Sequence, residues 1–290
     1  MMVLQSPAKL NLYLRIVGKR ADGYHELVTL FERIDLCDEI RLKPLKDGSI
    51  RIRCSHPDVP CNSQNIAYQA AQLLKKGLNV PSGVEITIRK RIPVAAGLGG
   101  GSSNAATVLK GLNQLWKLKL NVPQLVDYAR QIGSDVPFFL YDTSYALGTC
   151  RGDKITKVSL RAKLWHVLVV PRVKMLTKMV YGEVKAPLTE VKLSLTKKND
   201  NVNILIHHLR NNDIKAVGAT LCNDLEPAIF RLNPRLKDLK EKLKLFDIQG
   251  VAISGSGPSI FALTKTSSEA LRIKKLLTQH FKQVFVVQTY

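Results

Sequence analysis

A chain of 290 residues with 45% hydrophobic side chains is long for one core and excludes an intrinsically disordered protein. Its net charge of +21 is scattered over many segments, which favours a solvated basic surface over a nucleic-acid site. The longest apolar run, near 164–170, is too short to span a bilayer, and five cysteines without a Cys-x-x-Cys pair argue against a disulfide framework. We therefore expect two domains, over 1–160 and 161–290, in the cytoplasm, with neither nucleic acid nor a membrane as a partner.

Period-two alternation of apolar residues predicts a strand-rich first part of the chain. Strands are expected over 3–17 and 26–43, the second with a break near Asp38. The turn Asp47-Gly48 predicts that 50–53 is a short hairpin partner of the second strand. Periodicity then predicts a helix over 65–76, a strand over 84–88, and helices over 105–116 and 123–132.

The second part of the chain alternates helices with short strands. Strands flank the turn 151–153, and a buried strand is expected over 164–170. The segment 185–203 is polar and weakly periodic, which is typical of a loose stretch. Helices are predicted over 203–210, 213–222, 234–245 and 267–280, with strands over 250–254, 259–264 and 283–289. The sequence therefore predicts an α+β fold in two domains.

A glycine-rich string, Pro-Val-Ala-Ala-Gly-Leu-Gly-Gly-Gly-Ser-Ser-Asn-Ala-Ala at 93–106, joins the strand 84–88 to the following helix. Glycines let another group approach the backbone, and a helix N-terminus offers N–H groups and partial positive charge, so the natural guest is a phosphate. Ser102 and Ser103 could cap the helix, bond a phosphate oxygen or reach a metal ion. The string is not a Walker A loop, because no lysine follows Gly101, and a flexible turn capped by serine stays the alternative.

The same string resembles the second motif of the GHMP kinase superfamily, Pro-x-x-x-Gly-Leu-Gly-Ser-Ser-Ala-Ala. Its longer form with three glycines resembles the branch that phosphorylates 4-diphosphocytidyl-2-C-methyl-D-erythritol. Further blocks match this branch in the family's order: Pro-Ala-Lys-Leu-Asn-Leu at 7–12, Asp-Gly-Tyr-His-Glu at 22–26, Ile-Gly-Ser-Asp-Val-Pro-Phe-Phe at 132–139 and Ser-Gly-Ser-Gly-Pro-Ser-Ile-Phe at 254–261. The resemblance therefore covers nearly the whole chain.

The resemblance implies a two-domain fold, with a ribosomal-protein-like N-terminal domain and a ferredoxin-like C-terminal domain. It also implies an enzyme that transfers a phosphoryl group from ATP, with Mg²⁺, to the 2-hydroxyl of this cytidine diphosphate-linked polyol, a step of non-mevalonate isoprenoid precursor synthesis. Two alternatives stay open. One is a sibling kinase that acts on homoserine or mevalonate, and the other is a basic RNA-binding module that shares only the N-terminal fold.

The family motifs imply catalytic roles for Asp135 and Lys9. Asp135 would accept the proton of the substrate hydroxyl, and Lys9, paired with it, would stabilise the hydroxyl oxygen. Taken alone, these residues are typical of a turn aspartate and an exposed strand lysine. Substrate contacts are implied for Asn11, Tyr24, His25, Thr177 and Tyr181, with the tyrosines on the two faces of cytosine and His25 at its edge.

The implied ATP contacts centre on the glycine-rich string. The residues are Pro93, Gly97, Leu98, Gly99, Gly100, Gly101, Ser102 and Ser103, together with Asn65, Lys90, Gly255 and Gly257. Mg²⁺ is expected to bind with ATP, without a dedicated protein ligand beyond Ser102 or Ser103. One position departs from the family pattern Gly-x-Gly-Arg-Gly, because Cys150 stands in place of the middle glycine. A left-handed backbone there would strain Cys150 and alter the expected local contact with the substrate diphosphate.

Overall fold

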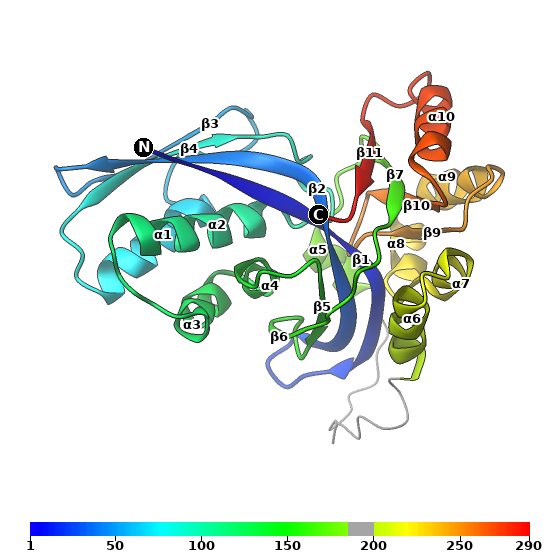
Figure 1. Ribbon diagram of the computed structural model, residues 1–290, viewed down its shortest axis with the longest axis horizontal. Coiled ribbons are helices and arrows are strands. Elements are labelled where there is room, and N and C mark those ends of the chain that lie inside the picture. The colour runs from blue at the N-terminus through cyan, green and yellow to red at the C-terminus, as the bar shows by residue number, and fades with distance from the viewer. Residues whose placement is uncertain (185–199) are drawn as a thin grey trace. The chain divides into compact units, whose positions relative to one another are not determined.

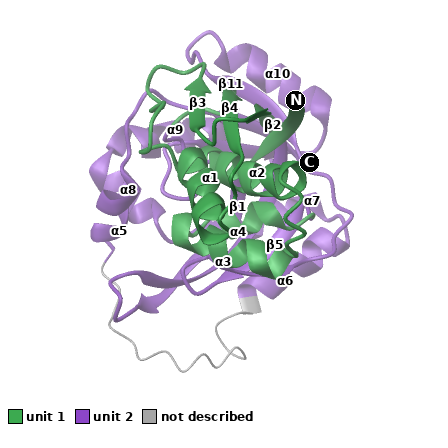
Figure 2. Ribbon diagram, turned by 90° about the vertical axis from the view of Figure 1, so that its left-hand side faces the viewer, with its two compact units in different colours: residues 1–8, 36–94, 99–142 green, residues 9–35, 95–98, 143–290 purple. Residues whose placement is uncertain are grey.

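The computed structural model describes residues 1–184 and 200–290, and its elements are labelled along the chain in Figure 1. The chain divides into two compact units, which are coloured separately in Figure 2. Unit 1 comprises 1–8, 36–94 and 99–142, and unit 2 comprises 9–35, 95–98 and 143–290. The long strands β1 (Met2–Lys19) and β2 (His25–Leu45) therefore contribute part of their length to each unit. Of the polar stretch expected over 185–203, residues 185–199 lie outside the described residues.

Unit 1 combines the second part of β2 with further strands and with helices. β4 (Gly83–Arg89) pairs antiparallel with β2, where Ile40 lies opposite Ile88, and β3 (Ile50–Cys54) pairs parallel with β4. The apolar face predicted for the helix after the glycine string is buried, including Val108 and Leu112. The helices of this unit are α1 (Ile66–Gly77), α2 (Gly100–Leu115), α3 (Val122–Ile132) and α4 (Val136–Leu140).

Two details of the sequence prediction for this unit are wrong. The strand β3 exists, but it pairs with β4 and not with β2, because the chain between Cys54 and Gly83 makes a crossover through α1 that suits parallel pairing. The break expected near Asp38 is absent, and β2 continues through this residue. The Asp38 carboxylate is buried within the strand because it accepts the backbone N–H groups of Arg91 and Ile92 at 2.7 and 2.9 Å.

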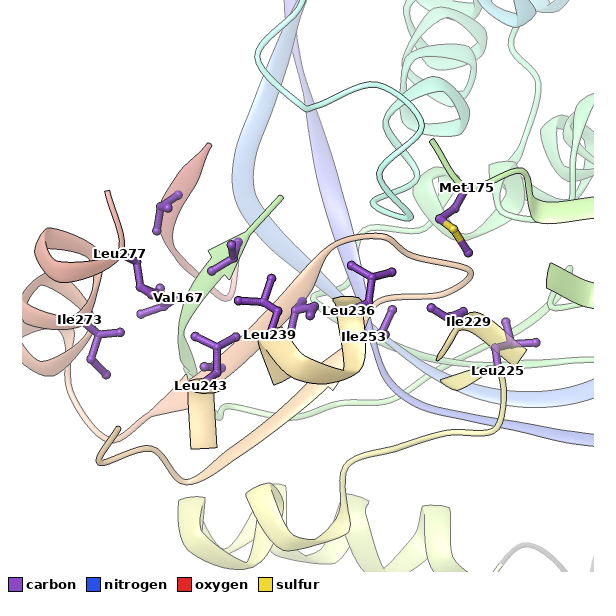
Figure 3. Close-up of a cluster of buried hydrophobic side chains, with 14 of the residues drawn as sticks. Val167, Met175, Leu225, Ile229, Leu236, Leu239, Leu243, Ile253, Ile273 and Leu277 are labelled. Carbon is purple, nitrogen blue, oxygen red and sulfur yellow. The ribbon is translucent and has the colours of Figure 1, made fainter. Parts of the chain in front are cut away.

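Unit 2 contains an antiparallel sheet with the strand order β11-β7-β10-β9. Helices cover this sheet with apolar side chains that include Ile229, Leu236, Leu243 and Ile273 (Figure 3). Burying a Leu or Ile side chain contributes about 1.5–3 kcal/mol, so this core stabilises the unit. The elements are β7 (Trp165–Val169), α5 (Thr177–Gly182), α6 (Asp200–Arg210), α7 (Ile214–Thr220), α8 (Glu226–Leu232), α9 (Pro234–Lys244), β9 (Gly250–Ile253), β10 (Ile260–Thr264), α10 (Ser267–Leu277) and β11 (Val284–Gln288).

Other strands of unit 2 pair with β1 and β2. β5 (Tyr145–Thr149) lies antiparallel to β2, and β6 (Lys154–Lys157) lies antiparallel to β5. β8 (Cys222–Asn223) pairs parallel with β1. These pairings bring the turn between β5 and β6, and the segment after β8, onto the strands that carry the first family motifs.

The predicted α+β character and the longer predicted elements are confirmed. Sequence periodicity misses α4, α5, α8 and β8, which have seven residues or fewer and are too short to show a period. Among the helices within 1–184 and 200–290, none has the length and apolarity needed to cross a membrane.

Candidate active site

The glycine loop, which we define as residues 93–103, leads from β4 into α2. Gly97 and Gly99 have φ values of 75° and 67°, in the left-handed region that favours glycine. Gly99 is the N-cap of α2 and provides no side-chain hydrogen bond to the helix. The first N–H groups of α2 can therefore donate to an anion, as the sequence predicts.

A buried polar network lies beneath the start of α2 in unit 1. Ser6 donates to Ser103 Oγ at 2.8 Å, and Asn104 Nδ2 donates to Ser6 Oγ at 2.9 Å and to Asp38 Oδ2 at 2.8 Å. Asp38 also forms a buried ion pair with Lys90. The network fixes the first turn of α2 to the strands below it.

The residues of unit 1 that are predicted to contact ATP differ in how accessible their side chains are. Ser103 is fully buried, whereas Ser102 is half-buried at the first turn of α2. Lys90 pairs with Asp38, and Asn65 caps α1 by accepting the N–H of Ala67 at 2.9 Å. Lys90 and Asn65 thus have structural partners in the fold. Of the two serine hydroxyls, that of Ser102 is the more accessible.

The second glycine turn, residues 254–257, packs directly on the glycine loop within unit 2. Ser254 Oγ donates to the carbonyl oxygen of Gly97 at 3.0 Å. A Cβ atom built on Gly255 would lie 3.2 Å from Asn11 Oδ1 and 3.3 Å from Lys9 Nζ. Sequence positions from three separate motifs therefore meet here, and Gly257 of the same turn also has a positive φ, 74°.

Lys9 is buried, with 3% of its surface exposed, although sequence alone suggests an exposed strand lysine. Its ammonium donates to Asn11 Oδ1 at 2.5 Å, and Asn11 Nδ2 donates to Thr29 Oγ1 at 2.8 Å. The backbone N–H of Lys9 bonds the carbonyl of Leu98 at 3.0 Å. β1 thereby joins the glycine loop to the buried ammonium.

Asp135 lies in unit 1 at the junction of two helices. The helix α3 ends with Gly133 as its C-cap, and Asp135 is the N-cap residue of α4. It is half-buried and makes no capping hydrogen bond to α4 with its side chain.

The aromatic residues predicted to bind the base belong to unit 2. The ring of His25 lies 5.3 Å from that of Tyr181, measured between centroids. His25 is buried, its Nε2 atom has no hydrogen-bond partner among the described residues, and burial, followed by the nearby charge of Lys19, lowers the pKa of its imidazole. Tyr24 is 54% exposed, and Thr177 Oγ1 lies 2.9 Å from Ser256 Oγ in the second glycine turn.

Sequence reasoning missed Asn223, which holds the second glycine turn. Its Nδ2 donates to the carbonyl oxygens of Ile253 and Gly255, both at 2.8 Å, and its Oδ1 accepts the N–H of Leu225 at 3.0 Å. An Asn-Asp pair directly after a predicted helix is typical of side chains that bond nearby backbone, and this was the available signal.

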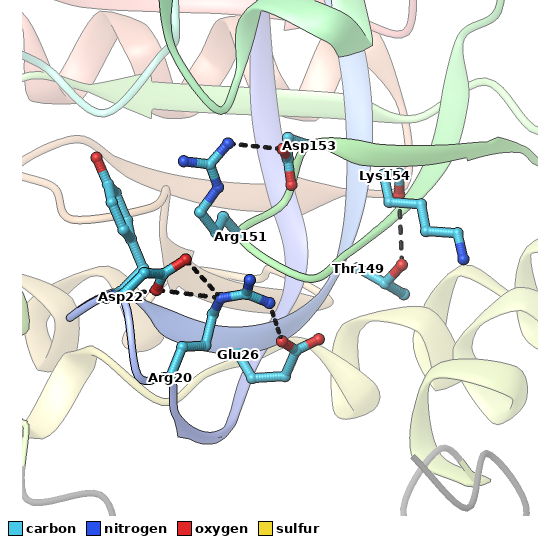
Figure 4. A network of polar contacts seen from close by, with 8 residues as sticks. Arg20, Asp22, Glu26, Thr149, Arg151, Asp153 and Lys154 are labelled. Atoms are coloured by element: carbon cyan, nitrogen blue, oxygen red, sulfur yellow. Dashed lines mark hydrogen bonds and ion pairs between the residues drawn. The ribbon is translucent and has the colours of Figure 1, made fainter. Parts of the chain in front are cut away.

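Cys150 has a φ of 61°, so the left-handed backbone anticipated at this position is present. It lies in the turn between β5 and β6, where its carbonyl accepts the N–H of Leu27 at 2.8 Å. The next residue, Arg151, pairs with Asp153 at 2.9 Å (Figure 4). Arg151 was not among the residues singled out from the sequence.

Comparisons with known proteins agree with these motifs. The family described as GHMP kinases N terminal domain matches residues 65–143, and GHMP kinases C terminal matches 205–283. The domain boundary expected at residue 160 falls between these matches and stays a prediction.

Proteins and structures similar to the whole chain were also found. A 4-diphosphocytidyl-2-C-methyl-D-erythritol kinase of Shouchella clausii is 42% identical over 98% of this chain and 93% of its own length. A crystal structure of 4-(cytidine 5'-diphospho)-2C-methyl-D-erythritol kinase is 32% identical, with a TM-score of 0.81 over 99% of this chain and 98% of its own. Homoserine kinase from Cytophaga hutchinsonii shares the fold at 23% identity and a TM-score of 0.76, over 100% of this chain and 94% of its own. The chain therefore belongs to the GHMP kinase family and has its two-domain α+β fold.

Proposed function

We propose that this chain transfers the γ-phosphoryl group of ATP to the 2-hydroxyl of 4-diphosphocytidyl-2-C-methyl-D-erythritol. The observation that carries the proposal is the packing of the second glycine turn on Gly97 and over Lys9 and Asn11. It puts the glycine backbone that we expect to bind phosphate beside the buried ammonium of Lys9 within one unit. The names of the relatives that match nearly the whole chain support this choice of substrate.

Phosphoryl transfer needs positioned phosphates, positive charge against the developing negative charge, and a group that takes the hydroxyl proton. The N–H groups of the glycine loop and of the first turn of α2 hold the ATP phosphates. The ammonium of Lys9, oriented by Asn11, stabilises the attacking oxygen, and Asp135 accepts its proton. The pairing of Asp135 with Lys9 stays a prediction.

Mg²⁺ in kinases is held largely by the nucleotide phosphates, with few protein oxygens. When bound with ATP, it supplies positive charge against the β- and γ-phosphates. The Ser102 hydroxyl suits a contact with it better than Ser103, which is buried and bonded to Ser6. Within the described ranges, no group of three or more His, Cys, Asp or Glu side chains could hold a metal ion.

The base is bound by Tyr24, Tyr181 and His25. Stacking on an aromatic ring contributes about 1–3 kcal/mol per base and tolerates any base, so the tyrosines supply affinity. A neutral imidazole can both donate and accept, so the buried Nε2 of His25 distinguishes cytosine from uracil at the edge of the base. Thr177, beside Ser256, positions the polyol.

The test is ADP release measured with the cytidyl substrate, its uridyl analogue, homoserine and mevalonate. We expect turnover with the cytidyl substrate, weaker use of the uridyl analogue, and none with the other two alcohols. Turnover with homoserine or mevalonate instead would overturn the substrate, and equal use of both bases would contradict base selection by His25. RNA binding that falls steeply with salt, without ADP release, would favour the RNA-binding alternative.

A further inference from the structure

Arg151 lies against the ring of Tyr24 at the turn between β5 and β6. The guanidinium carbon is 4.9 Å from the centroid of the ring, within the range of a cation–π contact. Arg151 Nη2 donates to Asp153 Oδ2 at 2.9 Å, and this hydrogen bond raises the pKa of Arg151 further (Figure 4). Asp153 is itself buried, with 8% of its surface exposed, so a buried carboxylate holds the guanidinium in place.

The backbone on both sides of this contact is also held. The turn that carries Arg151 is joined to β2 through the bond between Leu27 N–H and the Cys150 carbonyl, at 2.8 Å. The Tyr24 carbonyl accepts the N–H of Arg20 at 2.8 Å, and its N–H donates to Asp22 Oδ1 at 3.1 Å. Two turns held by hydrogen bonds thus bring a guanidinium and a phenol ring together, while Tyr24 as a whole stays 54% exposed.

We propose that Arg151 is a positioning residue that covers one face of the Tyr24 ring and presents the opposite face to the nucleobase. An exposed tyrosine that rotates freely loses side-chain entropy when a base stacks on it, and a ring already held in place avoids much of that loss. We assign the action of Arg151 to Tyr24 because its guanidinium lies against that ring while its Nη2 is bonded to Asp153. This inference rests on the proposed function, since it assigns the residue to the same base site.

The test compares kcat and KM of wild type, Arg151→Ala and Arg151→Lys. Arg151→Ala should raise KM for the cytidyl substrate roughly two- to fivefold, the size of an exposed cation–π contact, with kcat and KM for ATP unchanged. Arg151→Lys should recover part of the loss, because an ammonium keeps the attraction to the ring without the planar fork that binds Asp153. Unchanged KM in a folded Arg151→Ala variant would overturn the inference.

A double-mutant cycle separates positioning from direct binding. In a Tyr24→Ala background, removing Arg151 should leave KM for the cytidyl substrate unchanged, because the ring through which it acts is gone. A further loss in that background would mean that Arg151 contacts the substrate itself, and would overturn the proposal.

A matched control is Arg41→Ala. Arg41 also pairs with an acidic residue two positions away, Glu39, at 2.7 Å, and should leave both KM values unchanged when it is removed. A wild-type enzyme that does not use the cytidyl substrate would overturn the proposed function and this inference together. An active wild type with an unaffected Arg151→Ala variant would overturn this inference alone.

Discussion

A Cβ atom built on Gly97 would lie 2.2 Å from the carbonyl oxygen of Ser254, so the glycine loop and the second glycine turn meet backbone to backbone. Gly97 also has a φ of 75°, which residues with a side chain rarely adopt. The atom in the way belongs to the backbone and cannot rotate aside. This position therefore requires glycine for two independent reasons.

Gly97→Ala should destabilise unit 2 and abolish ATP binding. Gly23→Ala is the matched control, because Gly23 has a φ of 83° but nothing lies within 4 Å of its added Cβ. The control should lose about 1–2 kcal/mol from backbone strain alone, and Gly97→Ala about 1–3 kcal/mol more from the clash. Urea unfolding and the Kd for ATP measure both effects, and equal unfolding free energies would contradict the close packing. Gly100 is less suitable, because its added Cβ would meet Ile92 at 2.9 Å and would disturb packing within unit 1.

Asp135→Asn should lower kcat by roughly two to four orders of magnitude, the usual contribution of general acid–base catalysis, with a smaller effect on KM. The control is Asp127→Asn, since Asp127 is exposed on α3 and lies 3.9 Å from Arg130. ADP release at saturating substrate measures kcat for both. Near-normal turnover of Asp135→Asn would show that the carboxylate only orients the hydroxyl, which the loose transition state of phosphoryl transfer permits.

His25 should titrate below its usual pKa of 6.5, because burial disfavours the charged imidazole. Between pH 6.5 and this lower pKa the unfolded chain binds more protons than the folded one, so the free energy of unfolding should fall as pH falls. His25→Gln should lack that part of the acid sensitivity. NMR titration of the imidazole tests the first claim, and a midpoint at or above 6.5 would refute it.

Cys150→Gly should be more stable than Cys150→Ala by about 1 kcal/mol. Both variants lose the thiol, but only alanine keeps a Cβ at the left-handed φ of 61°. Glycine also has greater conformational freedom in the unfolded chain, and this offsets part of the stability gained by removing the strained Cβ. Thermal and urea unfolding of the pair measure the difference, and an equally stable alanine variant would show that this backbone is unstrained.

Asp38→Asn should destabilise unit 1 by about 3–5 kcal/mol, because it leaves the buried Lys90 ammonium without its charge partner. Asp47→Asn breaks an exposed ion pair with Arg51 and should leave the free energy of unfolding nearly unchanged. The double variant Asp38→Asn, Lys90→Met should recover part of the loss. Urea unfolding decides between these outcomes, and a small effect of Asp38→Asn would mean that water reaches Lys90.

The sequence by itself determined the parts of this protein that depend on neighbouring residues. Three local patterns predict a strand, a phosphate-binding loop and a helix: the alternation at 84–88, the glycines at 97–101 and the apolar face after Ala105. The strand β4 and the helix α2 lie where these patterns predict them. Periodicity is a property of one segment, so it can be read without knowing what that segment packs against. The family motifs predicted the two-domain fold in a similar way, since their order along the chain is visible in the sequence.

Tertiary structure alone decided the contacts between distant segments. The bond between Ser254 and Gly97 joins residues 157 positions apart, and no local pattern specifies it. The same holds for the burial of Lys9 and for the two carbonyl groups held by Asn223. It also holds for β4, whose place between β2 and β3 overrides the hairpin predicted by Asp47-Gly48. A turn signal concerns a few adjacent residues, whereas strand order depends on which apolar faces the whole chain can bury together.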